Sequence, residues 1–587
     1  MNAQFRQAMV GALRIGLVGG LVAVYLCLIG IVEVLSSRSV VEGIITVGQI
    51  LPLLTTLGAG YVAARRAADP ATEKRVAPSL AGGIVAGGVT GVVLALFVLI
   101  GNQIDVRAVF INASPILYSI LTFGLGLAGL WLLIGTGVVL GALGTLIHVL
   151  PSRVQQPLVL GFAAVVLAGL FAGLVRPLFI VHPGWPEDLG RYLFAQTGLT
   201  GAGALIAFLV VAGIDAAWSA RGKAAQESFR RLPAAGQATV RWGFFGFALI
   251  LALLLPNFSG SFIAQVIVLI SLNILMGLGL NITLGFAGLL DLGFVAFFAV
   301  GAYTVGLLTS YGQYGLMHLP FWAAVPIAVF VAMMVGAFLG LPVLGIRGDY
   351  LAIATLGFGE IVRLLAGSDF LAPWLGGPQG IIGIGKPCLG LLGSYQGVDI
   401  PQICNGFELS GPKEIYYLAL VSALLVAFVA TRLRDSRLGR AWMAVREDED
   451  VAEGLGVNLI QTKLLAYMLG ASFAGLGGAI FATLVGSIFA SSMQLLVSIN
   501  VVSLIIVGGM GSIPGVVVGA LVLIGLPEAF REFSDYRLLF YGAALIAMMI
   551  AKPAGLWPSS IVQRELHLVD GAEVETGAAS ATPAAAK

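Results

Sequence analysis

The segment Arg432–Lys463, RLRDSRLGRAWMAVREDEDVAEGLGVNLIQTK, separates two long apolar stretches of this chain. It holds twelve of the sixty charged residues (31 basic plus 29 acidic), six of each sign. A helix starting after Gly439 would lead into the acidic run that follows Arg446, and Gly454 and Gly456 are expected to end it. The pattern predicts a short polar helix and a turn between two membrane spans, where a partner outside the membrane could touch it.

The composition of the chain is that of a membrane protein. Of its 587 residues, 59% are hydrophobic and only 10% are charged, whereas a soluble domain carries about 25% charged residues. Apolar runs of roughly 20 residues recur, as membrane-spanning helices require. The 80 glycines would let such helices approach closely. We therefore predict an all-α polytopic membrane protein.

The first part of the chain contains six candidate spans. An uncleaved first span is favoured over a signal peptide, because the apolar run reaches about Leu35 and signal-peptide cores are only about 7–15 residues long. The predicted spans are Gly11–Leu35, Ile44–Ala64, Leu80–Ile100, Ile116–Leu133 (with a continuation to Leu150 as the alternative), Leu158–Val175 and Gly198–Ala217.

Basic segments set the predicted sidedness of these spans. Arg65, Arg66, Lys74 and Arg75 form one basic loop, and residues 221–241 carry five arginines or lysines against a single glutamate. The positive-inside rule puts both segments in the cytoplasm, together with the N-terminus. We predict an N-terminal transmembrane extension over 1–220, a basic cytoplasmic linker over 221–241, a core over 242–557 and a disordered cytoplasmic tail over 558–587.

The core contains about ten further candidate spans and begins on the cytoplasmic side. That topology puts residues 368–412 outside and the charged segment 432–463 inside, with a cytoplasmic C-terminus. Cys388 and Cys404 then share an outside loop, where a disulfide is one reading and two free thiols the other. The predicted spans are 242–256, 262–284, 290–310, 321–345, 350–367, 413–432, 463–485, 493–509, 513–530 and 537–551.

No motif for catalysis stands out. None of the seven lysines lies in a glycine-rich phosphate-binding loop, so the chain itself should not hold ATP. The four histidines lack metal-ligand spacing, and no nucleophile is paired with a base. We expect no enzyme activity, no resident cofactor or metal, and no nucleic-acid partner.

Polar residues inside the predicted spans are the candidates for a substrate path, since intramembrane polar residues are often functional. The alternative is that they only bond helix to helix, and Arg363 could pair with the glutamate three residues before it. No chain of buried acids for a proton relay is present. The candidates are Asn281, Asp291, Glu360, Asn500 and Ser503.

Four stretches resemble branched-chain amino acid ABC-transporter permeases of the LivM/LivH type. Two are GLNITLGFAGLLDLGFVAFFAVGAYT (Gly279–Thr304) and GDYLAIATLGFGEIVRLL (Gly348–Leu365). The third runs from Gly439 through the charged segment, and the fourth is the ending Lys552–Leu556. The resemblance covers roughly 260–557 and leaves the first 235 residues outside it.

The resemblance implies a permease core in the bacterial inner membrane that imports branched-chain amino acids. It implies four partners: a second permease subunit, two cytoplasmic ATP-binding subunits that carry the ATP, and a periplasmic substrate-binding protein. The charged segment would be the ATPase-coupling helix, with Trp442, Met443 and Val445 supplying apolar contact; the alternative is a solvated loop. The expected coupling residues are Gly439, Trp442, Met443, Arg446, Glu447, Asp448, Glu449, Gly454 and Gly456.

Three other functions stay open. A urea or short-chain amide permease would share these motifs. An ion-coupled secondary transporter would instead require coupling carboxylates and inverted repeats. In a non-transporting scaffold, the first 235 residues would do the work.

Overall fold

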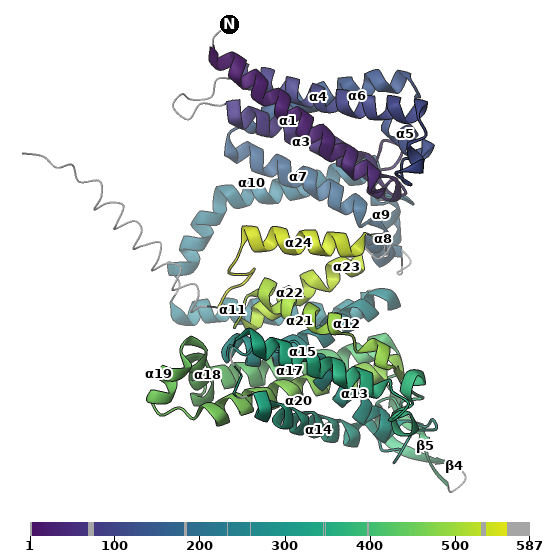
Figure 1. The fold of residues 1–587 in the computed structure, drawn as a ribbon, viewed down its shortest axis with the longest axis vertical. Helices are drawn as coiled ribbons and strands as arrows, with labels where there is room; N and C mark the ends of the chain where they lie inside the picture. Colours follow the sequence, from purple (N-terminus) through teal and green to yellow (C-terminus); the bar gives the residue numbers. More distant parts are fainter. Residues whose placement is uncertain are drawn as a thin grey trace, which may run out of the picture. The chain divides into compact units, whose positions relative to one another are not determined.

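The computed structural model describes residues 3–67, 76–180, 185–231, 233–258, 260–343, 345–346, 348–395, 398–529 and 536–559. It is built almost wholly of α-helices (Figure 1). The chain divides into two compact units, Met1–Ala252 and Leu253–Lys587. Lys74 and Arg75 of the predicted basic loop, and residues 560–587 of the predicted tail, lie outside the described residues.

Four long helices form the bundle of the first unit: α1 (Ala3–Leu28), α3 (Val47–Ala67), α4 (Val76–Gln103) and α6 (Ala128–Val149) (Figure 1). Glycines line the crossing of α4 with α6. A Cβ atom on Gly91 would lie 3.0 Å from the Leu133 carbonyl oxygen, and one on Gly87 would meet the Gly137 carbonyl. The two backbones approach closely because neither side of the crossing carries a side chain.

Shorter elements complete this unit, and α10 packs along α7. Its two short strands pair antiparallel, with Ser39 opposite Thr46. The elements are α2 (Ile31–Leu35), β1 (Ser39–Val41), β2 (Ile45–Thr46), η1 (Val106–Ala108), α5 (Pro115–Leu121), α7 (Ser152–Leu170), α8 (Ala172–Ile180), α9 (Trp185–Leu193), α10 (Gly201–Arg231) and α11 (Ala234–Phe258).

The predicted span Ile116–Leu133 has the wrong bounds, whereas its alternative end at Leu150 agrees with the end of α6 at Val149. Helix α5 ends at Leu121, and the apolar helix long enough to cross a membrane is α6. Between them Gly124 and Gly126 adopt φ of 74° and 56°, a left-handed conformation that ends a right-handed helix. The first predicted span likewise breaks at Gly30, which has φ of 84°.

The predicted linker 221–241 is largely helical. Helix α10 continues to Arg231, and α11 begins at Ala234. The basic residues of this segment are therefore carried on the ends of two long helices.

The second unit contains the remaining elements. Strand β3 pairs antiparallel with β6, and β4 with β5. The elements are α12 (Ser261–Leu280), η2 (Asn281–Phe286), α13 (Val295–Thr309), α14 (Phe321–Val343), α15 (Asp349–Ala366), α16 (Ala372–Leu375), η3 (Gly377–Gln379), β3 (Ile381–Ile382), β4 (Cys388–Tyr395), β5 (Val398–Glu408), α17 (Pro412–Asp435), α18 (Arg437–Glu447), α19 (Glu449–Gly454), α20 (Leu459–Val485), β6 (Ser487–Ile488), η4 (Ala490–Ser492), α21 (Leu495–Gly508), α22 (Ile513–Leu523), α23 (Gly525–Ala529) and α24 (Arg537–Ala551).

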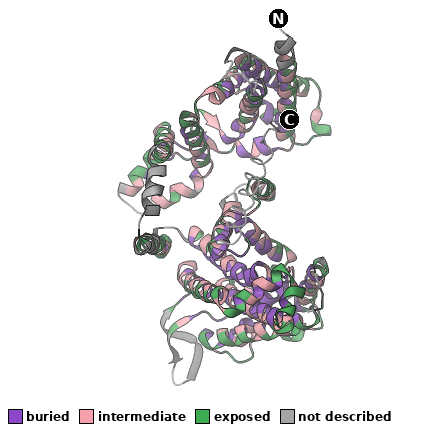
Figure 2. Cartoon of the chain, turned by 90° about the vertical axis from the view of Figure 1, so that its left-hand side faces the viewer, coloured by how far each residue is buried: buried purple, intermediate pink, exposed green. Residues whose placement is uncertain are grey.

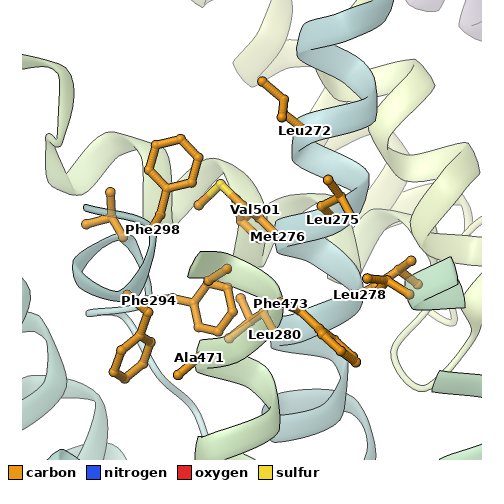
Figure 3. Close-up of a cluster of buried hydrophobic side chains, with 14 of the residues drawn as sticks. Leu272, Leu275, Met276, Leu278, Leu280, Phe294, Phe298, Ala471, Phe473 and Val501 are labelled. Atoms are coloured by element: carbon orange, nitrogen blue, oxygen red, sulfur yellow. The ribbon is translucent and has the colours of Figure 1, made fainter. Parts of the chain in front are cut away.

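Helix α20 lies at the centre of this unit and packs against α12, α13 and α14. Sixteen of its residues are buried. Figure 2 shows buried residues in purple in the interior of the helical bundles. Leu275 and Met276 of α12 belong to the same hydrophobic cluster as Phe294, Phe298 and Phe473 (Figure 3).

Eleven helices among the described residues are long and apolar enough to cross a membrane, and four shorter apolar helices accompany them. Six of the eleven lie in the first unit and five in the second. The chain is therefore a multi-pass α-helical membrane protein. The predicted span 350–367 corresponds to α15, which is not among the eleven and carries Asp349, Glu360 and Arg363.

The charged segment and the cysteine-bearing hairpin lie at opposite ends of the second unit. Figure 1 shows α18 and α19 at one end and β4–β5 at the other. Cys388 is disulfide-bonded, while Cys27 is free and buried. The side chain of Cys404, the predicted partner, lies outside the described residues.

Candidate functional site

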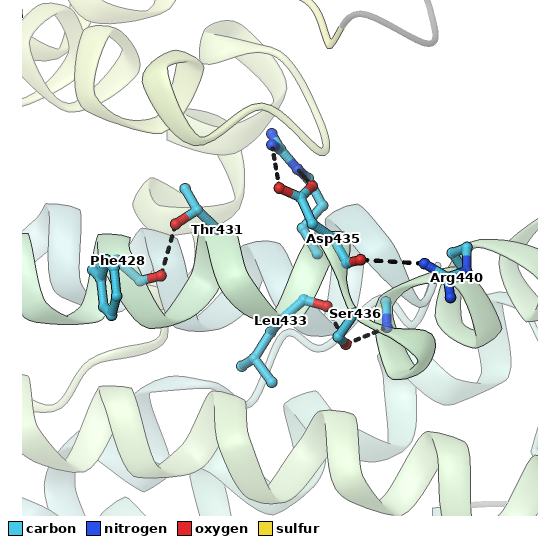
Figure 4. Close-up of polar contacts among 8 residues, drawn as sticks. Phe428, Thr431, Leu433, Asp435, Ser436 and Arg440 are labelled. Atoms are coloured by element: carbon cyan, nitrogen blue, oxygen red, sulfur yellow. Dashed lines mark hydrogen bonds and ion pairs between the residues drawn. The ribbon is translucent and has the colours of Figure 1, made fainter. Parts of the chain in front are cut away.

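The charged segment forms two helices, α18 and α19, where one was predicted. Helix α18 begins at Arg437, two residues before Gly439, because Ser436 caps it. The Ser436 Oγ accepts a hydrogen bond from the Gly439 N–H at 3.3 Å and donates to the Leu433 carbonyl at 2.6 Å (Figure 4). Arg440 donates to the Asp435 carbonyl at 3.2 Å, so the junction with α17 is tightly bonded.

Asp448 interrupts the predicted helix. Its backbone is extended, and its Oδ1 accepts from the N–H groups of Asp450 and Val451 at 2.9 and 3.0 Å. It is therefore the N-cap of α19. Gly454 is the last residue of α19, and Gly456 makes the left-handed turn at φ 87° that returns the chain to α20.

Two apolar residues of α18 point into the protein. Trp442 is fully buried and Val445 is 2% exposed. The Trp442 Nε1 donates to the Thr462 carbonyl at 2.7 Å, which fastens α18 to the first turn of α20. The prediction that these two side chains contact an outside partner is wrong; they anchor α18 to its own chain. Met443 is half-buried.

Two basic residues, Arg446 and Lys463, make the other side-chain contacts between the α18–α19 pair and the rest of the core. The Arg446 Nη1 donates to the Gly285 carbonyl at 2.7 Å, so α18 is tied to the π-helical turn η2 that ends α12. The Lys463 Nζ lies 2.7 Å from Glu449 Oε1, and the Lys463 side chain is only 4% exposed. Helices α18 and α19 are thus joined by side chains to both η2 and α20.

Asn281 and Asp291 stabilise backbone close to this junction. The Asn281 Oδ1 accepts from the Gly511 N–H at 2.9 Å, and the Asp291 Oδ1 accepts from the Gly293 N–H at 2.9 Å. Both residues are buried. Their contacts match the structural alternative to a substrate path, because non-helical backbone at membrane depth needs internal partners.

The loop that contains Asp291 is held on two further sides. Thr355 of α15 accepts from the Leu292 N–H at 3.0 Å, and Ser498 of α21 accepts from the Val295 N–H at 2.9 Å. The loop Ala287–Phe294 replaces the first turns of the predicted span 290–310 and connects the end of η2 to α13. Neither Thr355 nor Ser498 was predicted, since a lone hydroxyl residue in an apolar run gives no sequence signal.

Asn500 and Ser503 join α21 to α24. The Tyr541 hydroxyl donates to Asn500 Oδ1 at 3.2 Å and also bonds to Ser503. Glu360 pairs with Arg363 on α15, whose Nε lies 3.0 Å from both carboxylate oxygens. Asn281 lies in η2, to which Arg446 of α18 is bonded, and Asp291 lies in the loop after η2. Glu360 lies on α15, and Asn500 and Ser503 lie on α21. The five residues therefore do not form one cluster.

The outward surface of α19 combines charge with exposed apolar side chains. Val451 is 58% exposed and Leu455 is 79% exposed, and they are one helical turn apart. Glu447 and Glu453 are exposed beside them. We define Glu447, Val451, Glu453 and Leu455 as the α19 surface. The apolar pair was missed in the sequence, although its four-residue spacing on an otherwise polar helix is a readable signal.

The α18–α19 pair that carries the α19 surface is attached to the core at two places. Trp442 and Lys463 link it to the first turn of α20, and Arg446 links it to η2. Among the described residues, no group of three or more histidine, cysteine or acidic side chains could hold a metal ion.

Comparison with known proteins identifies relatives of the second unit. The family model described as "Branched-chain amino acid transport system / permease component" matches residues 262–549. The high-affinity branched-chain amino acid transport permease LivM of Escherichia coli (strain K12) is 40% identical over 350 residues, which is 58% of this chain and 80% of that protein.

More distant relatives include both permease types. The LivH permease of Salmonella typhimurium is 27% identical over 176 residues, 27% of this chain and 55% of that protein. A probable LivM of Methanocaldococcus jannaschii is 21% identical over 264 residues, 40% of this chain and 67% of that protein. No solved structure matches the chain.

Proposed function

The chain belongs to the branched-chain amino acid transport permease family, and we propose that it is the transmembrane permease subunit of an ATP-driven importer of these amino acids. The observation that supports ATP coupling most is the α18–α19 pair. It projects from one end of the core, yet side-chain contacts fasten it to η2 and α20.

The partners follow from this role. The relatives named as LivM and LivH support a second permease subunit beside this chain. ATP would be bound by two cytoplasmic subunits, since the sequence lacks a phosphate-binding loop. A periplasmic binding protein would deliver the amino acid to the opposite end of the core.

The α19 surface would dock in a groove of one ATP-binding subunit. Val451 and Leu455 would supply the apolar contact, while Glu447 and Glu453 at its edge would set orientation more than affinity. Closure of the ATP-binding subunits would then move α18 and α19 as one body and rock the attached spans. In this proposal both chain termini lie in the cytoplasm, and the protein belongs to a bacterial inner membrane.

Co-purification from a membrane containing the native partners tests the proposal. The tagged chain should bring down a second permease and an ATP-binding subunit, and Leu455→Asp combined with Glu453→Lys should lose the ATP-binding subunit alone. Leu389→Asp is the matched control, because Leu389 is an exposed apolar residue at the opposite end of the core (55% exposed). Recovery of an unchanged complex from the α19 variant would contradict the proposed docking.

The substrate class is tested by uptake. Proteoliposomes that contain the complex and its binding protein should accumulate leucine, isoleucine or valine only when ATP is supplied. Accumulation of urea or a short amide with no accumulation of these amino acids would overturn the substrate assignment, and uptake driven by an ion gradient would overturn the mechanism.

A further inference from the structure

Arg446 reaches from α18 to a part of the core that is remote in the sequence. Trp442 and Lys463 make their contacts within the stretch of chain that runs from α18 to the first turn of α20. Arg446 instead bonds to Gly285, which lies 161 residues earlier in the chain. Its contact therefore links α18 to η2, the segment through which α12 continues toward α13, rather than to a neighbouring element.

The carbonyl that Arg446 binds is at a position where a helix lacks donors of its own. Gly285 lies in the last turn of the π-helical segment η2, and the last carbonyls of a helix have no N–H group ahead of them from which to accept. The chain turns away at Gly288, whose φ is 72°. The Arg446 Nη1, 2.7 Å from the Gly285 oxygen, thus supplies a donor at the end of η2.

Two glycine turns lie against the Arg446 side chain. A Cβ atom on Gly288 would lie 2.8 Å from Arg446 Cγ, and one on Gly511 would lie 3.7 Å from Arg446 Nη1. Gly511 also has a positive φ of 75°, and its N–H donates to Asn281 Oδ1 of η2 at 2.9 Å. The Arg446 side chain fits between the two turns because neither turn carries a side chain there.

The C-terminal family stretch closes the same junction. The N–H groups of Leu556 and Trp557 donate to the carbonyls of Val507 and Gly508 at 2.8 and 2.9 Å. These carbonyls directly precede the turn between α21 and α22, so the ending Lys552–Leu556 is fastened to that turn. One junction thus joins α18, η2, the α21–α22 turn and the C-terminal segment.

We propose that Arg446 is the positioning residue through which the α18–α19 pair acts on the rest of the core. Its guanidinium holds η2 and the Gly511 turn beside α18, so that a movement of α18 displaces the break between α12 and α13 together with the end of α21. Without this side chain, Trp442 would still hold α18 to α20, but the movement of α18 would not be passed to η2. This inference rests on the proposed function and adds the residue on which coupling depends.

A purely structural role for Arg446 has a different consequence. A side chain that only caps η2 would contribute to stability, and its loss would lower ATP hydrolysis and uptake in proportion. A positioning role separates the two, since the ATP-binding subunits would still close while the spans no longer follow. The amount of amino acid taken up per ATP hydrolysed is therefore the decisive quantity. Arg446 is an exposed residue, so its substitution leaves no cavity in the core.

Substitution of Arg446 in the reconstituted complex tests the proposal. Arg446→Gln should keep complex assembly and ATP hydrolysis, while leucine uptake per ATP hydrolysed should fall at least tenfold. Arg446→Lys retains a cationic donor and should restore part of that ratio. Arg437→Gln is the matched control, because Arg437 is an exposed basic residue of the same helix, and it should keep the wild-type ratio. A wild-type ratio in Arg446→Gln would overturn the proposal, even with a lowered unfolding midpoint.

A reversible cross-link gives an independent measurement. A Cβ atom on Gly288 would lie 3.2 Å from Arg446 Cβ, close to the separation of about 3.5–4.5 Å that a disulfide spans. The double variant Gly288→Cys with Arg446→Cys should be uncoupled when reduced and should recover uptake per ATP when oxidised, because the disulfide replaces the lost attachment. Wild type, oxidised and reduced in parallel, controls for the native disulfide of Cys388.

Two results with the double variant would overturn the proposal: equal uptake per ATP in its oxidised and reduced forms, or introduced thiols that do not cross-link. Failure of the proposed function is a different result, because the wild-type complex itself would then show no ATP-driven amino acid uptake.

Discussion

Trp442 illustrates how far one residue's role can be inferred from sequence. Its place in the charged segment marked it as important, and its indole is indeed central to the attachment of α18. The direction in which it points could not be predicted, because burial at that position depends on α20, whose first turn supplies the accepting carbonyl. The residue type and its position in the segment indicated that Trp442 is important. The sequence did not indicate which helix its side chain packs against.

Trp442→Phe should lower stability measurably. The phenyl ring can fill most of the site, but the hydrogen bond from the indole Nε1 to the Thr462 carbonyl is lost, and such a bond contributes about 0.5–1.5 kcal/mol net. Thermal unfolding of the purified chain would show a lower midpoint than wild type. Met443→Leu, at the neighbouring half-buried position, should shift the midpoint little; an equal shift would argue against a specific role for the indole.

Glu449→Gln should destabilise the junction more strongly. It removes the ionic partner of Lys463, whose side chain is 4% exposed, and loss of one member of a buried pair costs about 3–5 kcal/mol. Glu447→Gln, at an exposed acidic position of the same segment, serves as the control. Equal unfolding midpoints for the two variants would show that the Lys463–Glu449 pair contributes no net stability.

Among the structural elements, the positions at which helices end were harder to predict than the presence of the helices. The apolar runs correctly predicted the presence of most spans, since length and hydropathy determine which segments can cross a membrane. The sequence did not reveal that α18 and α19 are separate, because the capping role of Asp448 depends on its extended backbone. The sequence also did not reveal that α13 packs closely on α20 at Gly301 and Gly475, because nothing distinguishes these two from the other glycines among the 80 of the chain.

The two glycines after the acidic run should respond differently to alanine. Gly456 has φ of 87°, where an L side chain costs about 1–2 kcal/mol, so Gly456→Ala should destabilise the return to α20. Gly454 has open space around its Cβ position and lies in a helix, so Gly454→Ala should be neutral or slightly stabilising. Unfolding midpoints of the two variants measure the difference, and the opposite order would contradict the turn geometry.

Gly301→Leu should disrupt the packing of α13 against α20. A side chain there would meet the Gly475 backbone directly, and overpacking of this kind costs about 1–3 kcal/mol or more. The variant should still insert in the membrane but show a lower unfolding midpoint and reduced complex yield. Gly246→Leu is a control, since the corresponding Cβ atom meets nothing within 4 Å.

At the scale of the whole molecule, the two ends of the core are expected to face opposite compartments. A cysteine replacing Gly454 should react with an impermeant thiol reagent only from the cytoplasmic side, and one replacing Ser410 only from outside. Both positions are exposed, at the α19 end and the hairpin end respectively. Labelling of both from one side would overturn the predicted topology.

The architecture of the whole molecule could be predicted from the sequence more fully than the candidate site. Six spans in the first unit and a permease core in the second were both readable, because composition and four family stretches extend over hundreds of residues. The assignment of the polar intramembrane residues to a substrate path stays a prediction. Asn281, Asp291, Asn500 and Ser503 bond to the protein itself, and whether a polar side chain has such a partner depends on contacts distant in sequence.

We propose that α18 and α19 carry ATP-driven motion into the spans of this chain. ATP-dependent leucine uptake by reconstituted wild type and by the variant Leu455→Asp with Glu453→Lys tests it most directly, with Leu389→Asp as the control. Wild type and control should show uptake, whereas the α19 variant should lose it although the chain inserts and folds normally. Undiminished ATP-dependent uptake by that variant would contradict it.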